Sequence, residues 1–163
     1  MSKREEAAHA SAAVDPAHVF PLIRELTADE SRALLGRHTV GHIAFSLNDR
    51  VDIQPIHYVF DEDWLYGRTS PGSKFATLAR HAWCAFEVDE VRDLFDWDSV
   101  VVKGNVELLD PEAGSPDAYT RALELMRSLV SGTFTDSDPT PHRSILFRIR
   151  VSELTGRAAR PGH

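Results

Sequence analysis

Cysteine is almost absent from this sequence. The 163 residues include a single one, Cys84, so the chain cannot form an internal disulfide bond, which favours a reducing compartment. The sequence also lacks an apolar run long enough to span a membrane, and the residues after Met1 do not have the pattern of a signal peptide. We therefore expect a cytoplasmic protein that does not enter a membrane.

Positive charge is also scarce. The chain has 18 lysine and arginine residues against 25 aspartate and glutamate residues, a formal net charge of −7, whereas general binding to nucleic-acid phosphates requires the opposite sign. Of the eight histidines, His38 and His42 lie on a predicted strand, with no cysteine or carboxylate pair to complete a metal site. The sequence has no nucleophile elbow, Walker loop or GxGxxG motif. We expect neither a nucleic-acid partner nor a bound metal.

The length and composition predict one globular domain. Apolar residues make up 42% of the chain and charged residues 26%, as in folded proteins large enough to bury a core without disulfide bonds. Residues 1–16 contain little that could be buried, so we predict a mobile N-terminal tail there. The remainder, residues 17–163, is predicted to form the single domain.

Two segments carry signals for both the start and the end of a helix, and a third helix is predicted to begin near Ser73. The capping box "TADE" at residues 27–30 predicts a short helix that ends at Gly36. Ser115 followed by Pro116 predicts the start of a second helix, which ends at Gly132. The buried stripe predicted for this second helix consists of Ala118, Ala122, Leu125 and Leu129.

Elsewhere apolar and polar residues alternate with the period of β-strands. Short links between the strands favour antiparallel pairing, and this number of alternating strands favours a closed barrel over an open sheet. We therefore predict a mainly β (α+β) fold, a six-stranded antiparallel β-barrel with peripheral helices. The six predicted strands are residues 38–45, 51–60, 63–69, 82–88, 99–108 and 144–151.

The stretch "RTSPGSK", residues 68–74, gathers hydrogen-bond donors where a predicted strand passes into a predicted helix. The first amides of a helix have no partners within it and carry the positive end of the helix dipole. Together with hydroxyl and cationic side chains, these amides would suit a phosphate monoester. The alternative is structural: a serine caps the helix, a Pro-Gly pair forms a turn, and the cations are solvated. The side chains concerned are Arg68, Thr69, Ser70, Ser73 and Lys74.

The order of motifs along residues 23–109 resembles the FMN-binding split-barrel family of pyridoxamine 5′-phosphate oxidase, and within it the small branch that includes the nitroimidazole-resistance proteins. A helix that ends in "LLGR" is followed by five strand motifs in the family's order: "HTVGHIAF", "QPIHYVF", "LYGRTSPGSK", "CAFEVDE" and "DWDSVVVKG". Each motif is weak alone, but six in the same order are fairly specific. The resemblance implies a split β-barrel that forms a homodimer, with FMN at the subunit interface.

The resemblance also implies which residues hold FMN. In this family the segment matching "RTSPGSK" grips the flavin phosphate, while the second strand and the start of the fifth lie beside the flavin ring. The implied phosphate ligands are Arg68, Thr69, Ser73 and Lys74, with Ser70 as a weaker candidate. The implied residues beside the ring are Gln54, Pro55, Ile56, His57 and Ser99.

Pro55 and His57 also carry arguments of their own. Proline cannot donate to a strand ladder, so the sheet is expected to have an edge or an interruption at Pro55, which would leave backbone groups for a ligand; the alternative is a simple bulge. His57 alternates with Pro55 and could face the ring and move a proton. A lone histidine on a strand is more often structural, however, and no partner to fix its tautomer is apparent.

The resemblance implies an FMN-dependent oxidoreductase of the flavin reductase or nitroreductase kind, acting on a small molecule. The chain lacks the arginine-rich second-strand signature and the C-terminal block of the pyridoxamine phosphate oxidases proper, so vitamin B6 oxidation is not expected. Two alternatives stay open. One is a deazaflavin-dependent reductase, which the negative net charge disfavours. The other is a non-catalytic flavin- or haem-binding protein.

Overall fold

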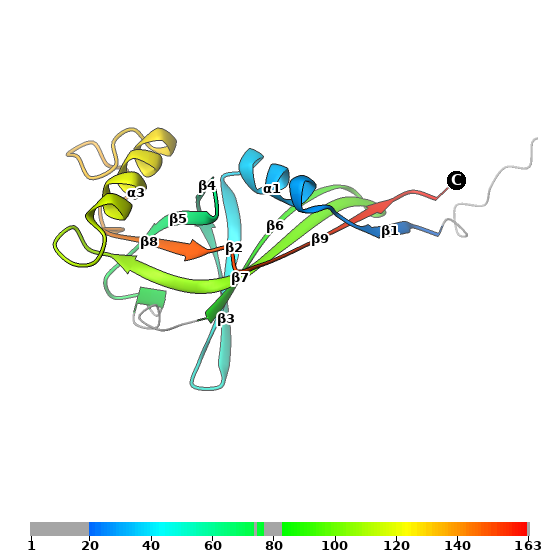
Figure 1. Ribbon diagram of the computed structural model, residues 1–163, viewed down its shortest axis with the longest axis horizontal. Helices are drawn as coiled ribbons and strands as arrows, with labels where there is room; N and C mark the ends of the chain where they lie inside the picture. The colour runs from blue at the N-terminus through cyan, green and yellow to red at the C-terminus, as the bar shows by residue number, and fades with distance from the viewer. Residues whose placement is uncertain (1–19, 74, 77–82, 163) are drawn as a thin grey trace, which may run out of the picture.

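The computed structural model describes residues 20–73, 75–76 and 83–162, so the predicted tail over residues 1–16 lies outside the described residues. In this part of the chain nine strands form one sheet, and both helices lie above it in the view of Figure 1. Neither described helix is long and apolar enough to cross a membrane. The elements are β1 (Leu22–Glu25), α1 (Ala28–Arg37), β2 (Val40–Leu47), β3 (Arg50–His57), β4 (Val59–Asp61), β5 (Trp64–Thr69), β6 (Trp83–Asp93), β7 (Asp96–Leu109), α3 (Pro116–Leu129), β8 (Ile145–Arg150) and β9 (Glu153–Arg160).

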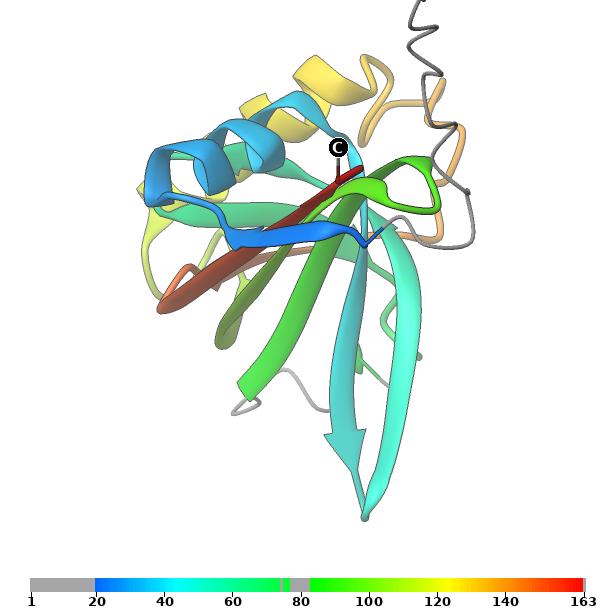
Figure 2. The ribbon, with the colours of Figure 1, turned by 90° about the vertical axis from the view of Figure 1, so that its right-hand side faces the viewer.

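Strand β7 joins the two halves of the barrel. Its residues 97–103 lie between β6 and β9, and its residues 106–109 pair with β8 instead. The strand order is β3-β2-β6-β7-β8-β5-β4, with β9 pairing to both β7 and β1, and every pairing is antiparallel. Figure 2 shows the long β2–β3 hairpin descending beside β6 and β7. The predicted antiparallel split barrel is confirmed.

Gly104 occupies the point where β7 leaves β9 and begins to pair with β8. A side-chain carbon at this position would collide with the backbone carbonyl of Arg150. The amide of Ser152, in the link between β8 and β9, donates to the carbonyl of Lys103 at 3.1 Å. Because two backbones meet this closely, only glycine fits at this point of the strand.

Strands β1 and β9 are not among the six predicted, and β3 and β4 together cover the single strand predicted over 51–60. Strand β9 buries Gly156, Ala158 and Ala159, residues too small to produce a clear hydrophobic alternation. The predicted strand over 51–60 is divided because Tyr58 turns into the core, where its hydroxyl donates to the carbonyl of Leu35 at 2.6 Å. Strand β1 has four exposed residues, and only its pairing with β9 reveals it.

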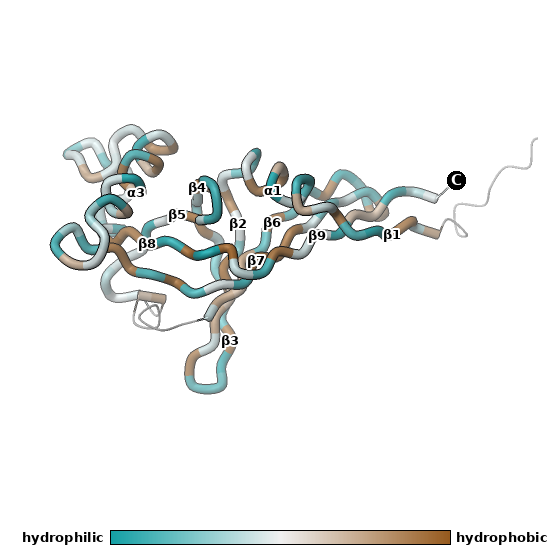
Figure 3. The backbone as a smooth tube through the Cα atoms, in the orientation of Figure 1, coloured by the Kyte–Doolittle hydropathy of each residue, from teal (hydrophilic) through white to brown (hydrophobic). Residues whose placement is uncertain are grey.

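The main core fills the barrel. It combines apolar side chains from β2, β3, β5, β6, β7 and β8 with Leu34 and Leu35 of α1, and hydrophobic and hydrophilic segments alternate along the strands (Figure 3). Cys84 belongs to this core at 2% exposure, and burial raises the pKa of its thiol to about 12. Cys84 therefore packs as a small buried apolar side chain.

A second, smaller core lies under α3, which covers the outer face of β5 and β8. Ala118, Ala122 and Met126 pack there against Tyr66 and Leu146. The predicted buried stripe of α3 is correct for Ala118 and Ala122. Its next buried residue is Met126, and the predicted Leu125 and Leu129 are only partly buried. The helix ends at Leu129, before the predicted Gly132.

The predicted helix starts are confirmed. Thr27 and Glu30 form the reciprocal capping box of α1, and the Ser115 hydroxyl accepts from the amide of Ala118 at the start of α3. Helix α1 runs one residue beyond Gly36, to Arg37.

Glu90 fixes the end of α1 to β6. Its carboxylate lies 2.6 Å from both Arg37 Nε and His38 Nε2. These partners, chiefly the Arg37 guanidinium, lower the pKa of Glu90 to about 2 from its ordinary value of 4.5. A carboxyl group with a lowered pKa stabilises the fold above its unfolded pKa, and that stabilisation disappears as the pH falls through the folded value.

We predict that Glu90→Gln lowers the melting temperature at pH 7, and that the difference from wild type shrinks as the pH falls from about 4.5 to about 2. Thermal unfolding followed by circular dichroism at a series of pH values measures this. Glu153→Gln is the control, because Glu153 is exposed. Equal effects of the two substitutions at pH 7 would contradict the prediction.

Candidate functional site

The turn after β5 brings two of the predicted phosphate ligands together. Thr69 ends the strand, and its hydroxyl lies 2.9 Å from the Ser73 hydroxyl. The Ser73 amide donates to the carbonyl of Ser70 at 3.1 Å, which closes the turn around Pro71 and Gly72. Lys74 lies outside the described residues.

Ser73 also has a structural role. Its hydroxyl accepts from the amide of Ala76 at 3.0 Å, three residues further on, which is the geometry of a helix N-cap. Phe75 and Ala76 are helical, and the rest of the helix predicted here lies outside the described residues. The structural alternative considered for Ser73 is therefore confirmed, and its cap places the hydroxyl at the positive end of a helix.

Arg68 projects away from this turn. Successive side chains of a strand point to opposite faces, and in β5 Leu65 enters the barrel core while Tyr66 packs under α3. Arg68 lies on the Tyr66 side, where its guanidinium donates to Asp138 at 2.6 and 2.9 Å. The structure thus separates Arg68 from the pair formed by Thr69 and Ser73, and its predicted role as a phosphate ligand stays a prediction.

The partner of Arg68 comes from the segment 130–144, between α3 and β8. The Arg68 and Asp138 side chains are 5% and 2% exposed, and Asp138 also accepts from the amides of Phe134 and Thr140, both at 2.9 Å. The hydrogen bonds from Arg68, followed by those from the two amides, hold the pKa of Asp138 well below its usual range. The carboxylate therefore stays charged, and its stabilising effect is lost only as the pH falls into the acid range.

We predict that Asp138→Ala lowers the melting temperature by several degrees, because it leaves the Arg68 guanidinium buried without its counter-charge. The control is Asp136→Ala, which removes an exposed carboxylate from the same segment. Differential scanning calorimetry of the two variants at neutral pH measures the effect. Equal melting temperatures for the two variants would show that the pair does not hold this segment.

The residues predicted to lie beside the flavin ring divide between the two faces of β3. Pro55 and His57 are exposed on the outer face, Gln54 is half-buried, and Ile56 enters the core at 8% exposure. Among the described strands β3 pairs with β2 alone and ends the strand order, so Pro55 lies on a sheet edge, as its chemistry requires. Ile56 therefore has only its backbone to offer a ligand.

Ser99, the predicted ring residue on β7, contacts a group that the sequence did not reveal. Its hydroxyl donates to the carboxylate of Glu87 at 3.4 Å, and His42 Nδ1 lies 3.5 Å from the same carboxylate. Burial, followed by the neighbouring Asp89, raises the pKa of Glu87. In the sheet, Pro55 of β3 lies opposite His42 of β2, and His42 lies opposite Glu87 of β6. These three residues therefore form a row across the outer face of the sheet.

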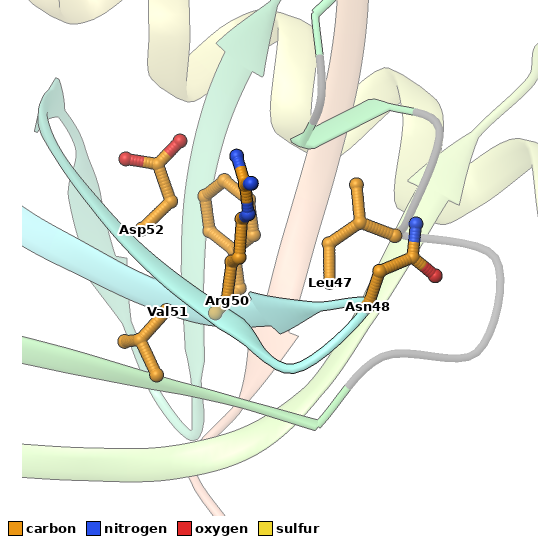
Figure 4. Close-up of a pocket in the computed structure, with 6 residues that line it drawn as sticks. Leu47, Asn48, Arg50, Val51 and Asp52 are labelled. Atoms are coloured by element: carbon orange, nitrogen blue, oxygen red, sulfur yellow. The ribbon is translucent and has the colours of Figure 1, made fainter.

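Two cavities lie at the two ends of β3. One, of about 190 Å³, lies between the end of β3, Arg68 and the segment 130–144. The other, of about 650 Å³, lies at the β2–β3 hairpin, and Figure 4 shows Arg50 and Asp52 directed to one side of the hairpin and Val51 to the other. None of the predicted flavin residues is among the described residues that line the hairpin cavity. In the described ranges no group of three or more histidine, cysteine, aspartate or glutamate residues could hold a metal ion.

Comparison with known proteins assigns the family. Residues 27–158 match the family model described as pyridoxamine 5′-phosphate oxidase, and the chain belongs to this family. None of the curated proteins compared with the chain matches it.

Solved structures share the fold. A FAD-binding protein from Mesorhizobium loti is 26% identical, with a TM-score of 0.67, over 85% of this chain and 99% of that one. A FAD-binding protein from Mycobacterium smegmatis is 22% identical, with a TM-score of 0.60, over 85% and 100% of the two chains. A proposed 5-nitroimidazole antibiotic resistance protein from Bacteroides thetaiotaomicron is 15% identical, with a TM-score of 0.61, over 87% and 90%. The resemblance to the pyridoxamine 5′-phosphate oxidase family is confirmed.

Proposed function

We propose that the chain is a flavoprotein oxidoreductase that binds FMN and acts on a small molecule. Membership of the pyridoxamine 5′-phosphate oxidase family supports this proposal, as does the similarity to a FAD-binding protein along nearly the whole length of that protein. The observation that carries it is the pair of hydroxyl groups of Thr69 and Ser73, 2.9 Å apart at the start of a helix. Such a turn suits a phosphate group.

The residues present fit the flavin. Thr69, Ser70 and Ser73, with the cation of Lys74, would hold the phosphate, while Gln54, Pro55, the Ile56 backbone, His57 and Ser99 would lie along the ring. The exposed outer face of β3 leaves Pro55 and His57 accessible to such a ligand. When bound, the flavin supplies hydride or electron transfer, and the chain's own part is binding, orientation and exclusion of water.

Homodimer formation belongs to the same proposal. The outer face of β2, β3 and β6 exposes large apolar side chains, with Val51 at 79%, Ile53 at 63% and Trp83 at 49% exposure. Exposed apolar patches of this kind are typical of protein interfaces. A second copy placed on this face would cover the apolar side chains and enclose a flavin lying along β3.

Light scattering coupled to gel filtration measures the oligomeric state of the protein. A monomer at all concentrations would contradict the proposed homodimer.

The cofactor itself is identified by releasing it from the purified protein and measuring its mass and absorption spectrum. We expect FMN. If FAD or haem is released, that molecule is the cofactor instead of FMN, and the protein still binds a cofactor. A colourless protein that binds none of the three would contradict the proposal.

We predict that Lys74→Ala weakens FMN binding by about 1.5–3 kcal/mol, roughly 10- to 150-fold, the usual contribution of a charge-assisted hydrogen bond. Riboflavin, which has no phosphate, is the control ligand, and its affinity is expected to stay the same. Quenching of flavin fluorescence on binding measures both affinities. Equal losses for the two flavins would contradict the phosphate assignment. Arg68→Ala is a less specific test, because it also breaks the pair with Asp138.

We predict that His57→Ala keeps the flavin, because the His57 side chain is exposed. Anaerobic reduction of the bound flavin by NADH or NADPH, followed in a stopped-flow instrument, then tests its role in the chemistry. Loss of turnover with the flavin retained would assign His57 a proton-transfer role. Unchanged turnover would exclude a proton-transfer role for His57.

A further inference from the structure

The cavity beside Arg68 has an unusual lining. It lies between the C-terminal end of β3, strand β5 and the segment 130–144, which folds back beside α3 in Figure 1. Its volume is about 190 Å³. The polar part of its wall is formed by His57, Arg68, Thr140 and Arg143, and the apolar part by Met126, Val130 and Pro139.

The charge of this wall is positive. No carboxylate is among the described residues that line the cavity. The nearest one in the hydrogen-bond network, Asp138, already accepts two bonds from Arg68 and one from each of two backbone amides, which use the four lone-pair positions of its oxygens. Among the described residues the Arg143 and His57 side chains form no ion pair, whereas eight other described arginines do.

The side chain of Arg68 and the backbone of Arg143 are held in position. Arg68 donates three of its five N–H bonds, two to Asp138 and one to the Thr140 hydroxyl at 2.7 Å, which fixes the plane of the guanidinium and leaves two N–H bonds unused. The amide of Arg143 donates to the carbonyl of Thr140 at 3.0 Å, so a tight turn sets the backbone of this second arginine.

From this arrangement we propose that the cavity is an anion subsite, in which Arg143, His57 and the free N–H bonds of Arg68 bind a carboxylate or phosphate group of a small molecule. Planar guanidinium groups match both anions in geometry, and the apolar wall of Met126 and Val130 strengthens the attraction by lowering the local dielectric constant. Pockets for whole ligands measure about 300–1,000 Å³. A cavity of about 190 Å³ therefore holds one anionic group while the rest of the molecule lies outside.

Two sources could supply this anion. One is the flavin, through its phosphate, and the other is a separate substrate that carries its own anionic group. The subsite does not rest on the proposed flavin function, because Arg68 and the pair of Thr69 and Ser73 lie on opposite sides of β5.

The first experiment uses the full-length chain freed of cofactor and inorganic phosphate as the probe. Calorimetric titration with phosphate, at an ionic strength balanced with chloride, is expected to show binding that Arg143→Gln weakens at least tenfold. Arg50→Gln is the matched control, since Arg50 is an exposed arginine at the tip of the β2–β3 hairpin, and it should bind like wild type. His57→Gln, which changes an exposed side chain and does not threaten folding, should weaken binding several-fold.

Unchanged phosphate affinity in both Arg143→Gln and His57→Gln would overturn the proposal, as would the absence of phosphate binding by the wild-type chain. If only His57→Gln weakens binding, Arg143 is not a ligand and the proposed subsite is also wrong.

The second experiment repeats the titration after loading with FMN or with riboflavin. Exclusion of phosphate by FMN but not by riboflavin identifies the flavin phosphate as the natural occupant, and it would place that phosphate in this cavity and not at the turn of Thr69 and Ser73. Phosphate binding that persists with both flavins identifies a separate anionic substrate. Both results support the anion subsite. If the chain binds no flavin, the proposed function is wrong, but the first experiment still tests the subsite because it uses phosphate alone.

Discussion

The crossing of β7 from one half of the barrel to the other is the constraint on which the remaining structure depends. One strand of 14 residues pairs with β6 and β9 along its first part and with β8 along its second. The change of partner happens at Gly104, where the backbone of Arg150 leaves no room for a side chain. The two halves built on β7 carry different groups. The half with β5 and β8 carries the hydroxyl turn and the buried arginine, and the half with β2, β3 and β6 carries the open outer face.

The alternation of side chains along β5 then divides the donor cluster into two sites. Thr69 and Ser73 meet in the turn, whereas Arg68 enters a pocket built by a segment some 70 residues further along the chain. The sequence presents these residues as one run of donors, but the pleat of the strand turns neighbours away from each other. Our two proposals follow this division, one for a flavin phosphate at the turn and one for an anion at the arginine pocket.

What could be predicted from the sequence was local in origin. The capping box of Thr27 and Glu30, the Ser115 cap and the edge position of Pro55 depend on residues close in the chain or on the chemistry of one residue, and all three are confirmed. The order of weak strand motifs was enough to identify the family. Strand β9 was missed because its buried residues are glycine and alanine, whose burial depends on α1 folding over them. Asp138 and Glu87 were missed because their partners are brought to them by the fold, and no local pattern marks such contacts.

The position of Pro55 on the last strand of the described sheet has a consequence for how copies of this chain can associate. The unpaired backbone groups of an edge strand can form hydrogen bonds with a strand of another chain. A proline in the edge strand has no N–H group and therefore removes one of these hydrogen bonds. Growth of the sheet from edge to edge, the route to fibrous aggregates, is thereby opposed at β3. The homodimer proposed above would instead use the exposed apolar side chains on the outer face of the strands.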